Sequence, residues 1–475
     1  MTTPRDPVLY IDCTSTFRSQ LNTGIQRVTR ALVNEAATFE KGLSLTCVPI
    51  CYQFNGFYRL DDALKITTDT TDQFTPVEFR FEDIYFCPDA FWTLEMAEWY
   101  PFLQDRGLSI ATLIYDLIPI EHPSFCTEEE TAKFEKSLLK VIEKSNLLPC
   151  ISHATKRALL NFCRERNIPL KADSCPVVPL APVVFQADET DTSSCRLPSG
   201  DFFLMVGTIE PRRAYRQALT EFIQYKQEGG QASLLIIGKA GPFDAEILDC
   251  IASEENSITW LADASDAELL AAYRKAQAVI CASHAEGYGL PVAEGLLYNG
   301  LVFANRLPVF GEFAGSLPYY FNIDKAGDLA RLLSEASSLP RLSAPPELGS
   351  WENTAESLAR ALAGISDRHG SQLAVEINRN TKEAIRWIYW LLLGRKCSKA
   401  EILFWSEFNL VSEVFRSVYY EYRKQDGPLT EETVRWAYAS IFGKVDLSDE
   451  EIQGSLSAFR TFGELCRHLY ALPRQ

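Results

Sequence analysis

Short apolar runs alternate with amphipathic stretches along the first three quarters of the chain. Runs rich in β-branched and aromatic residues are typical of buried strands, whereas apolar positions three or four residues apart predict helices. In the first part we expect strands at 8–13, 43–52, 83–87, 111–120 and 147–152, with helices at 24–37 and 128–144. Strands that alternate with helices indicate a parallel sheet covered by helices.

A second alternating block begins at residue 202, after a Pro-rich and polar stretch at 172–200 that is typical of a linker. Here the pattern predicts strands at 202–208, 233–239, 257–262, 278–283 and 301–306, with helices near 214–228, 243–253, 266–276 and 351–365. A polar break is expected at 367–372. The fold class is therefore α/β, with two Rossmann-like domains that face a cleft, where ligands usually bind.

The last hundred residues carry an internal repeat. The sequence IRWIY at 385–389 returns 49 residues later as VRWAY at 434–438. Two copies of one helical unit would stack into a small all-α domain, in which the aromatic residues favour packing over binding, although a protein-docking role stays open. The pattern thus predicts three domains, at 1–185, 186–367 and 376–475.

Composition narrows the choice of partners and compartment. A chain of 475 residues is long enough for two or three domains, and its net charge of −17 disfavours nucleic acid as a partner. The sequence shows no apolar run long enough to span a bilayer and no secretory signal, so we expect a cytoplasmic protein, with peripheral membrane contact left open. Thirteen Cys without a C-x-x-C pair predict reduced thiols and no metal site.

The strongest chemical signal is the segment 281–300, which joins a predicted strand to a predicted helix. Gly287 and Gly289 would let the backbone approach a ligand closely, and the first amides of the helix would face an anion. Glu286 and Glu294 bracket this turn, and carboxylates are suited to binding the hydroxyls of a sugar or a ribose. On spacing alone, these two glutamates could equally complement the helix dipole.

The run EGYGLPVAE at 286–294 resembles the E-x7-E signature of retaining glycosyltransferases of family 4, which have the GT-B fold. The resemblance implies that Glu286 lies beside the transferred sugar and that Glu294 holds the nucleotide ribose. It also implies that the backbone of Tyr288, Gly289 and Leu290 faces the donor sugar and phosphate.

Further segments resemble the same family in the expected order. In VGTIEPRRAYRQAL at 206–219, Arg212 and Arg213 match the basic element that stabilises the departing diphosphate, with Arg213 in place of the usual Lys. Two solvated arginines at a helix start are the alternative. The match at 257–283 places Trp260 and Leu261 near the nucleobase.

In the first half, Gly24 opens a helix where the family has a glycine pair, and a plain helix start is the alternative reading. Asp116 falls in the acceptor-side loop, where Tyr115 replaces the usual histidine. The contribution of that histidine either falls to Tyr115 or is absent. His122 and His153 lie nearby and are interpreted as structural.

The implied reaction transfers a hexose from a nucleoside-diphosphate sugar to a glycan or lipid-linked glycan, with retention, in the assembly of a cell-surface polysaccharide such as O-antigen or capsule. No cofactor is expected, and no metal, because D-x-D is absent. The alternatives are an inactive scaffold that recruits partners through its helical domain and a sugar-nucleotide epimerase of the same fold. A nicotinamide-dependent dehydrogenase is disfavoured because neither α/β half opens with G-x-G-x-x-G.

Overall fold

The computed structural model describes residues 6–379, with gaps, and four residues near the C-terminus. The gaps are 20–22, 54–55, 62–63, 65–74, 81, 94–95, 184, 186–194 and 242–244, and the further residues are 452–453 and 456–457. Residues up to Ile365, apart from 105–107, form one compact unit, and Ser366 onward with 105–107 forms a second. Apart from the end of one helix and those four residues, the predicted domain at 376–475 and its internal repeat lie outside the described residues.

The first lobe, residues 6–183, is built on a five-stranded sheet in the order β3-β2-β1-β4-β5. Its strands are β1 (Val8–Asp12), β2 (Thr46–Gln53), β3 (Gly56–Arg59), β4 (Ile84–Cys87) and β5 (Ser109–Thr112). Neighbours are parallel except for β3, which pairs antiparallel with β2. Isolated bridges continue the sheet beyond β5, since Ala111 pairs with Leu147 and Cys150 pairs with Val177.

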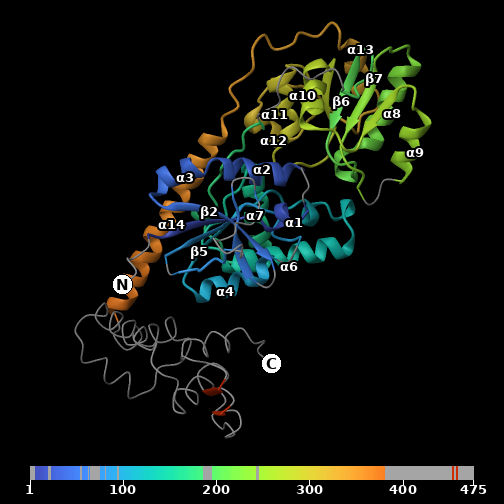
Figure 1. The fold of residues 1–475 in the computed structure, drawn as a ribbon. Helices are drawn as coiled ribbons and strands as arrows, with labels where there is room; N and C mark the ends of the chain where they lie inside the picture. Colours follow the sequence, from blue (N-terminus) through green and yellow to red (C-terminus); the bar gives the residue numbers. More distant parts are fainter. Residues whose placement is uncertain are drawn as a thin grey trace. The chain divides into compact units, whose positions relative to one another are not determined.

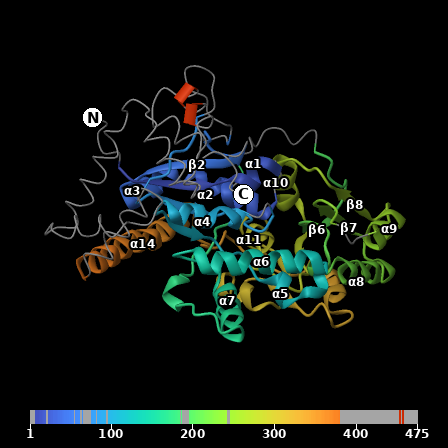
Figure 2. The ribbon, with the colours of Figure 1, turned by 90° about the horizontal axis from the view of Figure 1, so that it is seen from below.

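Alternate residues of each strand point to opposite faces of this sheet, and each face is covered by its own helices (Figure 1). Tyr10 and Ile110 belong to a core that also holds residues of α4 (Tyr100–Asp105), α6 (Glu128–Lys144) and α7 (His153–Glu165). Their neighbours Leu9 and Ile11 pack with α2 (Gly24–Asn34), α3 (Ala36–Leu43) and the long α14 (Trp351–Arg379). Figure 2 shows α6 and α7 on the side of the lobe away from α2 and α3. This two-sided burial is why the strands read as nearly continuous apolar runs.

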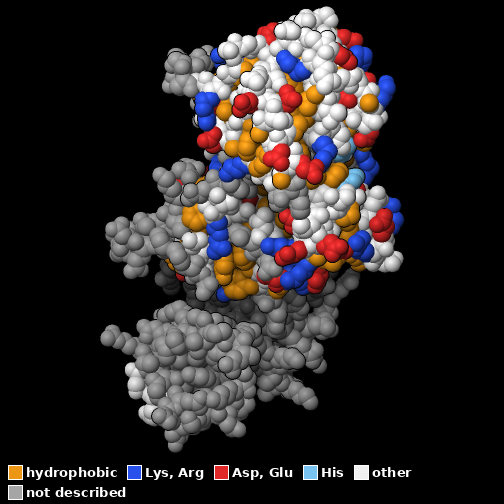
Figure 3. Space-filling view, turned by 90° about the vertical axis from the view of Figure 1, so that its right-hand side faces the viewer, with side chains coloured by type: hydrophobic (Ala, Val, Ile, Leu, Met, Phe, Trp, Pro, Cys, Tyr) orange, Lys and Arg blue, Asp and Glu red, His pale blue; other side chains and the backbone are white. Residues whose placement is uncertain are grey.

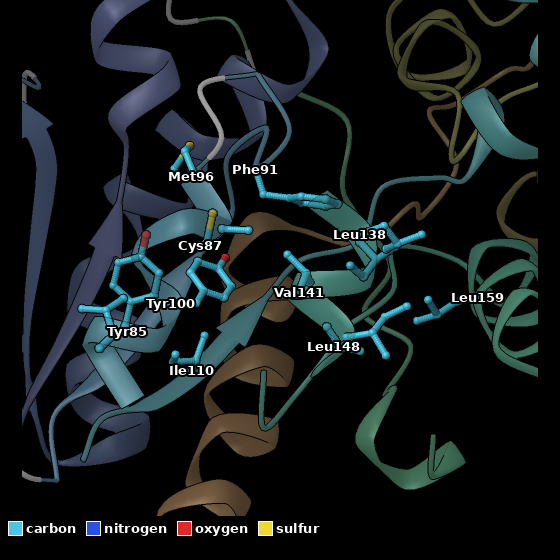
Figure 4. Packing of buried hydrophobic residues seen from close by; sticks show 14 of the residues in the cluster. Tyr85, Cys87, Phe91, Met96, Tyr100, Ile110, Leu138, Val141, Leu148 and Leu159 are labelled. Atoms are coloured by element: carbon cyan, nitrogen blue, oxygen red, sulfur yellow. The ribbon is translucent and has the colours of Figure 1, made fainter. Parts of the chain in front are cut away.

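Interlocking aromatic side chains fill the core on the α6 side (Figure 4). Tyr85 on β4 and Tyr100 on α4 are fully buried, with ring centroids 5.7 Å apart in an edge-to-face arrangement. The hydroxyl of Tyr85 accepts from the indole N–H of Trp99 at 3.0 Å and donates to the carboxylate of Asp12. The buried hydroxyl of Tyr85 therefore has partners, and so does that of Tyr100, which pairs with Thr112 at 2.8 Å.

Asp12, at the carboxyl end of β1, is a fully buried acid. Its Oδ1 accepts from the amide and the hydroxyl of Thr14, at 2.8 and 2.5 Å. Burial raises the pKa of Asp12 to about 6, although the hydrogen bonds from Thr14 and Tyr85 lower it. The folded chain therefore holds this carboxyl at a free-energy cost whenever it is ionised.

The second lobe, residues 195–350, contains a six-stranded parallel sheet in the order β11-β10-β9-β6-β7-β8. Its strands are β6 (Phe202–Val206), β7 (Ser233–Ile237), β8 (Ile258–Leu261), β9 (Ala278–Cys281), β10 (Val302–Asn305) and β11 (Tyr319–Phe321). Numbered within the lobe, this is the 3-2-1-4-5-6 order of the Rossmann fold. The predicted fold class, two Rossmann-like α/β halves, is confirmed.

Three helices cover each face of the second sheet. One face packs against α8 (Tyr215–Gln227), α9 (Ala245–Ser253) and α13 (Asp328–Glu335), and the other against α10 (Asp266–Lys275), α11 (Leu290–Tyr298) and α12 (Pro308–Phe313). The start of α10 is fixed by a capping box, in which Ser265 and Glu268 each accept from the other's backbone amide.

The start of α14 returns the chain from the second lobe to the first (Figure 1). Its first turns bury Ala355, Leu358 and Leu362 against the first lobe, and the indole N–H of Trp351 donates to the carbonyl of Pro182 at 3.1 Å. The polar break predicted at 367–372 is wrong, because α14 continues through it to Arg379. A segment with one Gly and no Pro costs a helix only about 1 kcal/mol.

Other predicted elements also differ from the structure. The strand expected at 147–152 forms only isolated bridges, because Pro149 at its centre cannot donate to a ladder. The strand expected at 111–120 ends at Thr112, after which α5 (Ile118–Glu121) begins. The stretch 172–183, predicted to belong to the linker, buries Cys175, Val178 and Leu180 in the first lobe. Within the described ranges, six helices and two strands were not predicted: α1 (Thr14–Ser19), α4, α5, α7, α12, α13, β3 and β11. The predicted helix at 24–37 reaches only the first two residues of α3.

Candidate active site

A cavity of about 590 Å³ lies between the two lobes. On the second lobe it lies at the carboxyl ends of β6 and β9, the two adjacent strands at which the strand order reverses. Such a switch point opens a crevice where ligands bind in α/β folds. The wall contributed by this lobe includes Gly207, Thr208, Gly238, Lys239, Asp263 and residues 286–291.

Two helices begin at this cavity. Thr23 and Gly24 at the start of α2 line it from the first lobe, and Gly289 and Leu290 at the start of α11 line it from the second. Neither first turn receives a hydrogen bond from a capping side chain. Their amide groups and the positive ends of both helix dipoles therefore converge on a space suited to an anion.

Arg212, Arg213 and Glu286 form a compact cluster in the wall. Arg212 Nη1 lies 3.0 Å from Glu286 Oε2, and Arg213 Nη1 lies 3.0 Å from Glu286 Oε1. Glu210 adds a second carboxylate, 2.7 Å from Nε of Arg212. The hydroxyl of Ser283 donates to Glu286 Oε1 at 2.8 Å. The two predicted cations thus lie together, and both contact the predicted sugar-binding carboxylate.

The electrostatics of this cluster favour its charged form. Burial alone would raise the pKa of Glu286, but Arg213, Arg212 and the Ser283 hydroxyl outweigh it and hold the pKa below its usual range. Burial would lower the pKa of Arg212, but the neighbouring carboxylates raise it above its ordinary value. Fixed charges of this kind can stabilise charge that develops on a bound ligand without reorganising.

A second cavity, of about 330 Å³, adjoins the first on the other side of Glu286. Asp116 and Glu286 line both cavities, so these carboxyl groups mark where the two meet. Burial raises the pKa of Asp116, and Arg212 lowers it in part. The polar wall of this second cavity is formed by Glu121, His122, Thr155, Arg157, Asn161 and His284.

An aromatic row crosses from one lobe to the other beside the second cavity. The ring of Phe125 stacks between His122, with centroids 5.5 Å apart, and His284, with centroids 5.9 Å apart. His122 and Phe125 belong to the first lobe and His284 to the second. His122, predicted to be structural, is exposed and lines this cavity, and His153 is exposed at the start of α7.

Tyr115 does not offer its hydroxyl to the cleft. The side chain is buried, and its hydroxyl donates to the carbonyl of Pro88 at 2.5 Å. The hydroxyl is held in the core of the first lobe, which favours the alternative that the histidine's contribution is absent. Its backbone carbonyl instead accepts from Thr155 at 2.9 Å and faces Gly287.

Gly287 and Gly289 are required by contacts within the protein. A Cβ on Gly287 would lie 2.1 Å from the carbonyl oxygen of Tyr115, in the opposite lobe. Gly289 has φ of +106°, and a Cβ there would lie 2.4 Å from the ring of Phe310. Both glycines also line the 590 Å³ cavity, so the close approach of a ligand stays a prediction beside these internal contacts. Between them, Tyr288 donates to the carbonyl of Leu180 at 2.5 Å.

Glu294 lies on α11 but does not line the cavity. Its side chain is 0% exposed, and it accepts from Arg27 Nη2 at 2.7 Å and from the hydroxyl of Tyr273 at 2.7 Å. Trp260 and Leu261 also stay outside the wall. The indole N–H of Trp260 donates to the carbonyl of Gly238 at 2.7 Å. The wall includes residues 262–264 instead.

Two cations in the cavity wall were not singled out from the sequence. Arg27 is one turn into α2, three residues after Gly24, and Lys239 follows β7. In the sequence, the only indication of a role in binding was that Arg27 follows a predicted helix start and Lys239 ends a predicted strand. Within the described ranges, no group of three or more His, Cys, Asp or Glu is arranged to hold a metal ion.

Residues 193–343 match the family described as Glycosyl transferases group 1. The matched segment includes most of the second lobe and contains the Arg212, Arg213 and Glu286 cluster. This match covers the donor-side signature of the sequence but not the first lobe.

Among curated proteins, the chain is similar to the serotype-specific mannosyltransferase WbdA of Escherichia coli. The two are 25% identical over 389 residues, which is 75% of this chain and 46% of WbdA. The chain thus spans about half the length of the curated relative that it matches. The matched part of this chain is longer than the second lobe alone.

Among solved structures, the chain is similar to Anabaena HepE in complex with UDP-glucose, with a TM-score of 0.49 and 14% identity over 78% of this chain and 100% of HepE. It is also similar to the α,α-trehalose 6-phosphate synthase of Burkholderia multivorans, with a TM-score of 0.47 and 13% identity over 78% of this chain and 98% of that one. At these scores the likeness is loose.

Proposed function

We propose that this protein is a retaining glycosyltransferase that moves a hexose from a nucleoside-diphosphate sugar to a hydroxyl of a glycan or lipid-linked glycan. The observation that carries the proposal is the 590 Å³ cavity between the lobes, on which two helix N-termini and the Arg212, Arg213 and Glu286 cluster converge. This combination suits a diphosphate joined to a sugar.

In this proposal each part of the donor has a counterpart. The diphosphate and sugar face backbone amides at the starts of α2 and α11. These are the amides of Gly24 and of Tyr288 to Leu290. Arg212 and Arg213 stabilise the negative charge that develops as the nucleoside diphosphate leaves. Glu286 contacts the transferred sugar, and Glu294 holds the ribose.

The acceptor enters from the 330 Å³ cavity, where Asp116 lies beside the reaction centre. Its polar wall suits the hydroxyls of a sugar ring, and the rings of His122 and His284, which line it, suit the apolar face of that sugar. Closure of the lobes over both substrates excludes water that would hydrolyse the donor. The raised pKa of Asp116 suits a carboxyl that exchanges a proton with the acceptor hydroxyl.

The reaction belongs to the assembly of a cell-surface polysaccharide such as O-antigen or capsule. The similarity to WbdA, a serotype-specific mannosyltransferase, supports this assignment and makes mannose the first sugar to test. We place the reaction in the cytoplasm, at the inner face of the membrane where lipid-linked acceptors are available. Among the described residues, no helix has the length and apolarity needed to cross a bilayer.

Nucleic acid is not a partner in this proposal. On the described part of the face shown in Figure 3, Lys and Arg side chains are interspersed with Asp and Glu and do not gather into one basic area. No metal takes part, since the fixed arginines supply the positive charge. Protein binding through residues 376–475 stays a proposal from sequence.

Thermal unfolding with added UDP, GDP or ADP tests donor binding. One nucleotide should raise the melting temperature of the wild type, since a ligand at 100 times its Kd stabilises a protein by about 2.7 kcal/mol. Arg213→Gln should lose this effect. The matched control is Arg216→Gln on α8, whose guanidinium is 65% exposed and pairs with Glu246. If no nucleotide stabilises the wild type, the proposed donor site is wrong.

A further inference from the structure

An ion pair between the lobes occupies the carboxylate proposed to bind ribose. Arg27 extends from α2 of the first lobe, and its Nη2 lies 2.7 Å from Glu294 Oε1 on α11 of the second lobe. Nη1 of the same guanidinium lies 3.4 Å from Oε2. The two side chains are 11% and 0% exposed, so solvent screens their attraction little.

Both partners are held on their remaining sides. The hydroxyl of Tyr273 donates to Glu294 Oε2 at 2.7 Å, and the ring of Phe185 lies 5.0 Å from the guanidinium carbon of Arg27. Burial lowers the pKa of Arg27, but Glu294 and Tyr273 raise it by more, so the cation is maintained. A buried carboxylate left without such a partner would be strongly destabilising.

The position of Arg27 controls access to Glu294. Arg27 lines the 590 Å³ cavity, whereas Glu294 does not line it and has no exposed surface. Arg27 thus contacts both the cavity and the carboxylate. A ribose in the cavity can form hydrogen bonds with Glu294 only if Arg27 moves aside, and its hydroxyls would then replace the donors that Arg27 supplies.

We propose that Arg27 sets the affinity for the donor by competing with the nucleotide ribose for Glu294. Because Arg27 and Glu294 belong to different lobes, the exchange also removes a contact that holds the lobes together, so donor binding and lobe movement are coupled. The inference rests on the proposed function, since it takes a nucleoside diphosphate as the occupant of the cavity.

Calorimetric titration of Arg27→Gln with UDP and with GDP tests the competition. The neutral Gln is a weaker competitor for Glu294, so the variant should bind the preferred nucleotide at least about tenfold more tightly than the wild type, a change of about 1.4 kcal/mol. The matched control is Glu312→Gln, which removes another ion pair between the lobes, that with Arg157 at 3.4 Å. Its nucleotide affinity should equal that of the wild type.

The outcomes separate this inference from the proposed function. Binding by the variant that is unchanged or weaker, while the wild type binds, overturns the competition and leaves the proposed function standing. Binding by neither protein overturns both. A rise in affinity for Glu312→Gln equal to that for Arg27→Gln would assign the effect to general loosening of the lobes and overturn the role of Arg27.

A crystal structure of the unmodified chain with UDP or GDP gives a second test that does not depend on a variant that folds. With the nucleotide bound, ribose hydroxyls should lie within hydrogen-bond distance of Glu294, and Arg27 Nη2 should lie more than about 4 Å from it, beyond the usual limit for an ion pair. A bound nucleotide with the Arg27–Glu294 pair intact at its present 2.7 Å overturns the proposal.

Discussion

Replacing Asp12 with Asn should change how the stability of the chain depends on pH. Asp12 is fully buried at the end of β1, and its Oδ1 accepts two hydrogen bonds from Thr14. An Asn side chain reproduces the neutral carboxyl: its oxygen can accept from Thr14, and its NH2 group can donate to the hydroxyl of Tyr85. The variant therefore keeps the shape of the site but removes the charge.

The magnitude follows from the pKa. Burial raises the pKa of Asp12 from 3.8 to about 6, so folding favours the protonated form. Well below pH 3.8 the carboxyl is neutral in both states and costs nothing, whereas above pH 6 its ionisation in the folded chain costs about 3 kcal/mol, at about 1.4 kcal/mol per pKa unit. The wild type should therefore lose about 3 kcal/mol relative to Asp12→Asn as the pH rises from about 3 to about 7.

Urea unfolding followed by tryptophan fluorescence at a series of pH values measures this difference. Trp99 donates to Tyr85 and so reports on the same network. The matched control is Asp201→Asn, the same chemical change on an exposed side chain beside β6, whose curve should stay parallel to that of the wild type. If the curves of Asp12→Asn and the wild type stay parallel between pH 4 and 7, the inference that burial raises the pKa of Asp12 is wrong.

Three further predictions concern the cleft. Gly287→Ala should lower the stability by about 2 kcal/mol or more in thermal unfolding, because the new Cβ would lie 2.1 Å from the Tyr115 carbonyl oxygen. Gly311→Ala is the control, since it has open space around it and should not lower the stability. Equal effects of the two substitutions would contradict the contact between the lobes. Glu286→Gln should lower kcat on the order of 10²-fold with a smaller change in the KM of the donor. The control Glu246→Gln changes an exposed side chain and should leave kcat unchanged. A change confined to KM would contradict the place of Glu286 beside the reacting sugar. Transfer should continue in EDTA, and a loss that Mg²⁺ or Mn²⁺ restores would contradict metal independence.

Periodicity predicted most strands of both sheets because they are buried on two sides. The apolar runs at 8–13, 202–208 and 278–283 each contain a strand of the structure. Some short elements were not predicted. α12 and β11 have six and three residues, which is too few for a hydrophobic period to be recognised. The apolar run around Pro149 had the opposite effect: it resembles a strand in the sequence, but the proline prevents a full ladder and only isolated bridges form.

The candidate site was predicted in part. The family resemblance assigned Arg212, Arg213 and Glu286 to one donor site, and in the structure these three side chains contact one another. Contacts between lobes could not be read from the sequence, because they depend on how two separate domains face each other. Arg27 and Glu294 are 267 positions apart in the chain, and nothing in either segment indicates their pairing.

The most direct test of the account is the product of the reaction, followed by proton NMR at the anomeric position. GDP-mannose, UDP-glucose and UDP-galactose would each be incubated with the purified chain and a mixture of short mannose, glucose and galactose oligosaccharides. The account predicts a new glycosidic linkage with the anomeric configuration of one donor, and its loss in Glu286→Gln. An isomerised sugar nucleotide, or donors that all remain unchanged in the presence of the wild type, would contradict glycosyl transfer.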